Sequence, residues 1–297
     1  MNHLRRNGGL SLSIVIPSGG QVPQLIQCLN SIVEQTLRKS AFEIIVVLPS
    51  RAANSVHAQL HDIGLENLVI LSHPVASANH SRNEGAQFAK GEWLFFLDDD
   101  CVLTDAQALV RRITLHEQLG SKVIFSGDYL SIRKMRVWGR AYNLVVNLWL
   151  ANAFQRPHRL RFVGGNVSCR RDQFQSIEFN ESLNGGGEEE ELAMQFVSQG
   201  AVGFQASELA VCHLSNHTAS SFFRRAVTHG LAKSIIKGAP GLSKNPPTMG
   251  DLCSLLQKYF RLCHAEPLAT LLALSYLSVC AFSHRLAART LRQKELV

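Results

Sequence analysis

The first hundred residues alternate between short apolar runs and segments with helical spacing, and this alternation constrains the fold most strongly. Runs typical of buried strands lie at 13–16 (SIVI), 42–48 (FEIIVVL), 67–71 (NLVIL) and 93–97 (WLFFL). Between them, 22–35, 54–63 and 80–90 have the apolar spacing of helices. Strand–helix–strand units of this length predict an α/β fold, with a mostly parallel central sheet covered by helices on both faces.

A parallel sheet of this kind places its ligands at one edge. The carboxyl ends of the strands meet there, and ligands bind in the crevice outside them. The loops that follow Ile16, Leu48, Leu71 and Leu97 are therefore the first place to look for functional residues. The pattern alone fits many nucleotide-binding folds.

Charge and cysteine usage narrow the class of protein. The net charge of +7 favours anionic partners such as nucleotide phosphates or lipid head groups. Seven widely spaced cysteines without a C-x-x-C pair argue against a disulfide framework or a structural zinc site, and are typical of a reducing compartment. The apolar run at 12–17 is too short for a signal peptide. We therefore expect a cytoplasmic protein, and no nucleic-acid partner, because basic residues are interleaved with aliphatic ones.

Asp98, Asp99 and Asp100 end the fourth apolar run. Adjacent carboxylates repel one another, and a divalent cation relieves that repulsion, since Mg²⁺ and Mn²⁺ prefer hard oxygen ligands and also hold phosphates. The alternative is a solvated acidic turn, or an N-cap for a helix that begins near Thr104. The position at the carboxyl edge of the sheet favours the metal site.

Three further motifs are weaker when taken singly. Three glycines at 185–187 precede four glutamates at 188–191, which suits an acidic first helical turn without any further role. The alternative is that one glutamate is a general base. Gly164, Gly165 and Asn166 form either an ordinary turn or a close backbone approach to a ligand. His213 is structural unless it converges with Asp100 on a metal ion.

The order and spacing of these motifs resemble the family-2 glycosyltransferases of the GT-A fold. The most specific part runs from Ser81-Arg82-Asn83-Glu84-Gly85 to Phe96-Leu97-Asp98-Asp99-Asp100. The motifs at 164–166, 187–192 and 213 follow in the family's order. The resemblance covers about residues 10 to 235.

The resemblance implies a role for each matching residue. Asp98, Asp100 and His213 would hold Mn²⁺ or Mg²⁺, and Glu189, or failing it Glu188, would be the catalytic base, with Glu190 facing solvent. Contacts to the nucleotide sugar would come from Pro17, Ser18, Arg82, Asp98, Asp99, Gly165 and Asn166. The sequence departs from the family pattern in three places. Leu48 stands where an acidic residue usually contacts the nucleotide, and the base position is glutamate rather than aspartate. The first loop, Ser18-Gly19-Gly20, lacks the tyrosine or asparagine that is common there.

The resemblance further implies an inverting glycosyltransferase, which moves a sugar from a nucleotide-diphosphate donor, expected to be a UDP-sugar, to a glycan or lipid-linked acceptor. One alternative is a metal-dependent sugar nucleotidyltransferase, although 18–22 lacks the cation expected in its phosphate loop. Another is a catalytically silent sugar-nucleotide-binding scaffold, which the departure at Leu48 permits.

The remaining sequence predicts two regions. Residues 1–237 would form the GT-A domain, with a nucleotide-binding part at about 10–105 and an acceptor-side part at about 106–237. Residues 238–297 would form a helical region, with a linker at 238–248 and helices at 252–262 and 267–283. The last of these has no charged residue and is followed by basic ones. We expect peripheral contact with the inner face of the membrane; the alternative is a helix buried against the catalytic domain.

Overall fold

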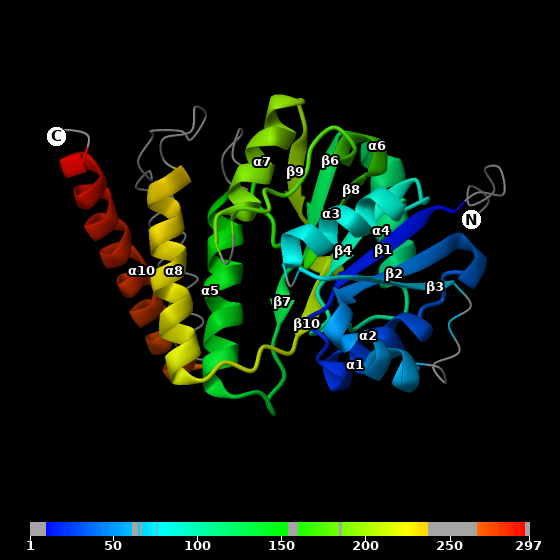
Figure 1. Ribbon diagram of the computed structural model, residues 1–297, viewed down its shortest axis with the longest axis horizontal. Coiled ribbons are helices and arrows are strands. Elements are labelled where there is room, and N and C mark those ends of the chain that lie inside the picture. Colours follow the sequence, from blue (N-terminus) through cyan, green and yellow to red (C-terminus); the bar gives the residue numbers. More distant parts are fainter. Residues whose placement is uncertain are drawn as a thin grey trace.

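The computed structural model describes residues 10–60, 65, 67–75, 77–153, 160–183, 186–236 and 266–294. Its centre is a seven-stranded sheet with the order β3-β2-β1-β4-β8-β6-β9 (Figure 1). The strands are β1 (Leu12–Pro17), β2 (Phe42–Pro49), β3 (Leu68–His73), β4 (Trp93–Leu97), β6 (Val123–Ser126), β8 (Asn166–Arg170) and β9 (Val202–Gln205).

The sheet is mostly parallel, as the sequence predicts. β1 pairs in parallel with β2 and β4, β2 with β3, and β6 with β9. β8 runs antiparallel to both of its neighbours, β4 and β6. A smaller sheet, β5-β10-β7, brings Cys101–Leu103 of β5 and Val211–His213 of β10 together with Tyr129–Leu130 of β7. This second sheet places His213 next to the end of β4.

Alternating side chains of the central strands feed two separate cores. Ile14 and Ile16 face one core, which contains buried residues of α1 (Val22–Val33), α2 (Ser50–Leu60) and α4 (Ala108–Leu119). Val15 faces the other core, with buried residues of α3 (Ala78–Phe88) and α7 (Glu188–Ser198). The continuous apolar runs are therefore explained by burial on both faces. Short helices complete the domain: η1 (Lys39–Ala41), α6 (Arg171–Phe174) and η2 (Ser207–Leu209).

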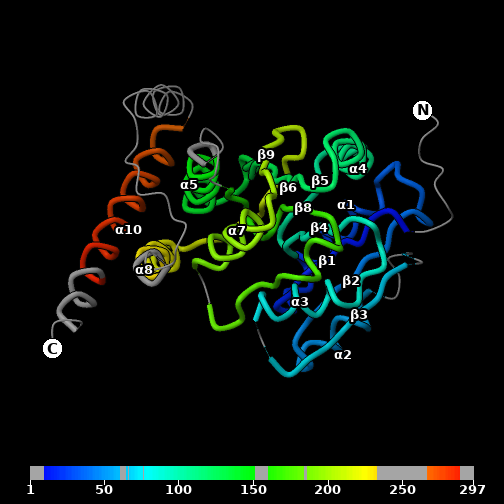
Figure 2. The backbone as a smooth tube through the Cα atoms, turned by 90° about the horizontal axis from the view of Figure 1, so that it is seen from above, coloured from blue at the N-terminus to red at the C-terminus, as the bar shows by residue number. Residues whose placement is uncertain are grey.

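Three long helices stand beside the sheet: α5 (Val137–Ala153), α8 (Ala219–Ile236) and α10 (Pro267–Lys294). Both views show α10 next to α8 at the end of the molecule away from β3 (Figures 1 and 2). α10 packs against α8 and α5, and buries Ala269, Ala273, Tyr276 and Cys280 on one face. The predicted linker at 238–248 and the predicted helix at 252–262 lie outside the described residues.

Candidate active site

A pocket of about 450 Å³ opens at the carboxyl edge of the sheet. The loops after β1 and β4 form one part of its wall, and α7 and the three long helices form the rest. Most residues expected at the site line it: Pro17, Ser18, Arg82, Asp98, Asp99, Asp100, Gly165, Glu188, Glu189 and His213. These residues come from distant parts of the sequence, and the fold brings them together in one pocket.

The three aspartates make three different contacts. Arg82 donates from Nη2 to Asp98 Oδ1 at 2.7 Å, and its side chain is almost fully buried. Ser18 Oγ donates to Asp99 Oδ2 at 2.6 Å. Burial raises the pKa of Asp99 to about 7, against the lowering effect of that hydrogen bond. Asp98 is therefore paired with Arg82 of α3, whereas Asp99 holds the loop after β1 in place through its hydrogen bond with Ser18.

Asp100 faces His213, with 3.3 Å between Oδ2 and Nε2. His213 Nδ1 lies 2.6 Å from Asn143 Oδ1. The Asn143 amide also donates to the His213 carbonyl at 3.0 Å, which leaves its oxygen as the acceptor. This network places a proton on Nδ1 and directs Nε2 toward the Asp100 carboxylate. A carboxylate oxygen and an imidazole nitrogen that face each other fit a divalent cation such as Mn²⁺.

Burial raises the pKa of Asp100, but attraction and hydrogen bonding by His213, together with attraction by Arg225, lower it below its ordinary value. Cys101 also offers a sulfur within 4.8 Å of the Asp100 and His213 ligand atoms. Burial raises the pKa of the Cys101 thiol well above its usual range. Mn²⁺ and Mg²⁺ prefer oxygen and nitrogen ligands to sulfur, so the carboxylate and the imidazole are the fitting ligands of this group.

Gly164 and Gly165 allow the backbone to approach the charged residues. A Cβ atom at Gly165 would overlap the Asp98 carboxylate and lie 2.7 Å from the Tyr129 hydroxyl. One at Gly164 would lie 3.0 Å from the Arg82 guanidinium. The glycine pair is thus needed for close packing against the Asp98–Arg82 ion pair rather than for an unusual φ angle.

Glu189 lies in the first turn of α7, where Gly187 caps the helix in a left-handed conformation with φ of 92°. The Gly164 N–H donates to Glu189 Oε1 at 3.5 Å. Burial, together with repulsion from Glu188, raises the pKa of Glu189 to about 8, although Arg82 opposes this. A raised pKa in a pocket is typical of a carboxylate that exchanges protons. Glu190 lines the same pocket, so the expectation that it faces solvent is wrong.

Asn166 is the predicted contact that the structure places elsewhere. Its side chain is fully buried and does not line the pocket. It accepts a hydrogen bond from Arg112 Nη2 at 2.7 Å and donates to the Leu209 carbonyl at 2.9 Å. All of these bonds lie within the protein, so Asn166 supports the glycine turn instead of reaching the sugar through its side chain.

Sequence reasoning missed the wall that the long helices supply. Tyr142 of α5, Arg225 and His229 of α8, and Tyr276 of α10 all line the pocket. Tyr276 Oη lies 2.9 Å from His229 Nδ1. The sequence predicted a helix at 267–283, but not which of its side chains face the site, because the contacts join residues far apart in sequence. Residues from both predicted regions, 1–237 and 238–297, thus line one pocket.

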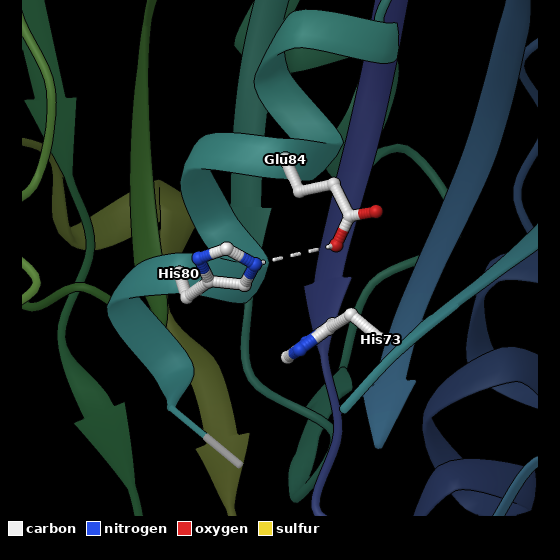
Figure 3. A group of neighbouring side chains, drawn as sticks. All are labelled: His73, His80 and Glu84. Carbon is white, nitrogen blue, oxygen red and sulfur yellow. Dashed lines mark ion pairs between the residues drawn. The ribbon is translucent and has the colours of Figure 1, made fainter. Parts of the chain in front are cut away.

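A second group of potential metal ligands lies outside the pocket. His80 and Glu84 stand one turn apart on α3, and His73 approaches them from β3 (Figure 3). The Val75 N–H donates to His73 Nδ1 at 3.1 Å, so Nε2 carries the proton and faces Ser81 Oγ at 3.0 Å. Both ring nitrogens of His73 are therefore engaged within the protein, which argues against metal ligation there.

Side chains of α3 instead form hydrogen bonds with the chain segment that precedes α7. His80 Nδ1 lies 2.8 Å from Glu181 Oε2. Asn83 donates to the Phe179 carbonyl at 2.8 Å, and Asn79 donates to the Leu183 carbonyl at 2.6 Å. The same helix carries Arg82, so it links the aspartates to the segment that leads to the glutamates of α7.

Comparison with known proteins agrees with this geometry. Glycosyltransferase AglE of Haloferax volcanii is 32% identical over 180 residues, which are 60% of this chain and 58% of that protein. The matched segments cover between 16% and 58% of the length of the curated relatives.

Two solved structures share the fold at low identity. The mannosyltransferase PcManGT from Pyrobaculum calidifontis, in complex with GDP-Man and Mn²⁺, has a TM-score of 0.59 at 15% identity, over 99% of this chain and 84% of that one. S. aureus TarS 1-349 in complex with UDP-GlcNAc has a TM-score of 0.53 at 13% identity, over 96% and 92%. The sequence pattern of Glycosyl transferase family 2 matches residues 13–177, more than half of the chain. The chain therefore belongs to glycosyl transferase family 2.

Proposed function

We propose that this protein transfers a sugar from a nucleotide-diphosphate donor to a hydroxyl group of an acceptor, with inversion at the anomeric carbon. One observation carries the proposal: the Asp100–His213 pair and the Glu189 carboxylate line the same pocket as Ser18 and Arg82. A cation site and a candidate base are thus both next to a wall suited to a nucleotide.

The proposed donor lies between the loop after β1 and the aspartates. Pro17 and Ser18 would contact the nucleoside, and the Ser18–Asp99 hydrogen bond holds that loop in place. Arg82 and Asp98 form the floor, where Gly165 allows close approach. A divalent cation bound by Asp100 and His213, with Asp98 as a further proposed ligand, would offset the charge that develops on the diphosphate leaving group.

Glu189 is the proposed general base. It would accept the proton of the acceptor hydroxyl while that oxygen attacks the anomeric carbon, and the bond from that carbon to the diphosphate would break. A single displacement needs no covalent intermediate and inverts the anomeric configuration. Glu188 lies next to it and carries a buried Oε2 without a hydrogen-bond partner among the described residues. It is the second choice for the same role.

We propose a UDP-sugar as the first donor to test. The neighbouring structures hold different donors, GDP-Man in one and UDP-GlcNAc in the other, so they favour a nucleotide sugar without favouring one base. Leu48 is fully buried, and the adjacent Pro49 lines the pocket. An acidic contact to the nucleoside is therefore absent at this position.

For the acceptor we propose a glycan or a lipid-linked sugar, met at the inner face of a membrane. Among the described residues, 267–287 form the helical stretch that is long and apolar enough to cross a bilayer, but 33% of its most apolar window is buried in the protein. The opposite face of α10 is exposed and apolar, with Leu271 at 63% and Phe282 at 67% exposure. A helix with one face packed and the other exposed favours peripheral binding over a span.

A donor screen tests the proposal. The full-length protein is incubated with UDP-, GDP- and dTDP-sugars, Mn²⁺ or Mg²⁺, and a membrane extract as the source of acceptor. Release of one nucleoside diphosphate, dependent on the cation, is the expected result. Absence of release with every donor would leave a nucleotide-sugar-binding scaffold as the better account.

A further inference from the structure

Arg225 is a cation that the proposed chemistry does not yet use. It lies on α8, lines the pocket, and is exposed to it. Its guanidinium carbon is 5.1 Å from the centre of the Tyr142 ring. Among the described residues, no carboxylate forms an ion pair with it, in contrast to Arg82, which is paired with Asp98. An arginine stays charged at any physiological pH, so this position favours an anion.

The place of Arg225 in the pocket indicates whether this anion belongs to the donor or to the acceptor. The nucleotide wall is built by the loops after β1 and β3 and by α3, whereas Arg225 belongs to the wall of long helices. α8 touches the loop of the proposed base, since a Cβ atom at Gly186 would lie 3.1 Å from His229 Cδ2. The base must contact the acceptor, so the space beside Arg225 is the acceptor's side. The donor diphosphate already has a cation site at Asp100 and His213.

Arg225 lies among aromatic rings and near the charged residues of the site, since Tyr142, Tyr276, Glu189 and Asp98 all interact electrostatically with it. Val145, Val146 and Trp149 of α5 and Leu277 of α10 also line the pocket. An apolar wall that carries one cation suits an amphiphile with an anionic head group. The helices that form the wall also carry the exposed apolar residues of the molecule's outer end: Val227 and Leu231 of α8, and Leu268, Leu271, Leu274, Phe282 and Leu286 of α10.

We propose that the acceptor is a sugar joined through phosphate to a membrane lipid, and that Arg225 binds this phosphate while the first part of the lipid chain lies along α5 and α10. This inference rests on the proposed function. A phosphate oxygen needs no general base, so a carboxylate base indicates that the nucleophile is a sugar hydroxyl.

The step is then fully balanced. The hydroxyl proton passes to Glu189, and the new bond joins the hydroxyl oxygen to the anomeric carbon. The bond from that carbon to the donor diphosphate breaks, and its electron pair leaves with the nucleoside diphosphate. The lipid phosphate remains unchanged on Arg225 and serves only to hold the acceptor.

Binding of farnesyl phosphate, below its micelle concentration, tests this assignment without any turnover. Trp149 lies in the pocket, so its fluorescence reports occupancy. Wild type should bind farnesyl phosphate much more tightly than farnesol or inorganic phosphate. Arg225→Gln should weaken farnesyl phosphate roughly 10- to 100-fold, the loss of a charge-assisted contact, and Arg225→Lys should lose less. Arg224→Gln is the matched control, because Arg224 is exposed on the same helix but does not line the pocket.

Two outcomes would overturn the inference. If farnesyl phosphate binds wild type no better than farnesol or inorganic phosphate, the pocket does not recognise a lipid phosphate. If Arg225→Gln weakens nucleoside diphosphate binding in Mn²⁺ as much as farnesyl phosphate binding, Arg225 serves the donor instead. The donor screen reports separately on the proposed function, because nucleotide release with another acceptor would stand even if lipid phosphate did not bind.

Discussion

The run of three aspartates is explained by three separate environments. Asp98 is paired with Arg82, Asp99 accepts from Ser18, and Asp100 faces His213. Neighbouring carboxylates repel one another, so each needs its own partner to stabilise its charge. The sequence predicted the cluster and its place at the sheet edge, because an apolar strand that ends in acids is a local signal. It could not predict Asn143, which orients His213 from 70 residues away.

Glu189→Gln should reduce the transfer rate while donor affinity stays unchanged. The glutamine has almost the same shape but cannot accept the proton, and loss of a general base costs about 10²–10⁴-fold in rate. Steady-state kinetics and donor titration measure the two effects. Glu191→Gln is the control, because Glu191 accepts a hydrogen bond from Gln195 and does not line the pocket. Equal, mild losses at 188, 189 and 191 would mean that the acids only begin a helix.

The rate should depend on pH through the same carboxylate. The pKa of Glu189 is about 8, raised by burial and then by Glu188. A base acts only when deprotonated, so the rate should rise with pH and level off above about pH 8. Glu188→Gln removes the like charge, lowers the pKa of Glu189 and should move the rise to lower pH. A kcat–pH profile that stays the same in this variant would contradict the assignment.

At the scale of elements, the strands β1, β2 and β4 were predictable because burial on both faces favours a continuous apolar run, and β3 was predictable from its apolar run although it is only half-buried. β8 has no such continuous apolar run, because Asn166 and Ser168 interrupt it. Both side chains are buried against α4: Arg112 donates to each, and His116 lies 2.9 Å from Ser168 Oγ. These polar residues of a central strand are explained by hydrogen bonds to partners that lie more than 50 residues away in the sequence.

The glycine turn before β8 gives a prediction at this scale. Gly165→Ala should impair nucleotide binding and destabilise the protein by about 1–3 kcal/mol, the usual cost of overpacking, because the added Cβ overlaps the Asp98 carboxylate. Thermal unfolding and nucleotide titration in Mn²⁺ measure both effects. Gly19→Ala is the matched control in the same pocket, since a Cβ there meets nothing within 4 Å. Equal behaviour of the two variants would show that the close approach is unimportant.

At the scale of the whole molecule, the C-terminal region completes the pocket as well as carrying the apolar surface. The sequence predicted the apolar helix from its composition, and left open whether it is buried or lies at a membrane. The structure shows one face of α10 buried at Ala273 and Tyr276, and the opposite face exposed at Leu271 and Phe282. A periodic pattern alone cannot say which face has a partner inside the protein.

The full-length protein should sediment with anionic lipid vesicles at low salt. Leu271→Ser combined with Phe282→Ser should reduce the bound fraction, since burying each large apolar side chain contributes about 1.5–3 kcal/mol. Leu130→Ser is a control for another exposed apolar residue, at 43% exposure on β7. A protein that stays in solution with vesicles at low salt would refute peripheral binding. Extraction from cell membranes by detergent alone would indicate a true span.

Phosphorus NMR of the complete reaction tests the central claim, that this pocket breaks the bond between sugar and diphosphate with the help of Asp100 and His213. With the donor found in the screen, Mg²⁺ and acceptor, wild type should produce the nucleoside diphosphate and no pyrophosphate. Chelation of the cation, or Asp100→Asn, should stop this reaction, while Asp105→Asn, at an exposed surface ion pair, should not. Pyrophosphate as the product, or unchanged turnover in Asp100→Asn at limiting cation, would contradict the account.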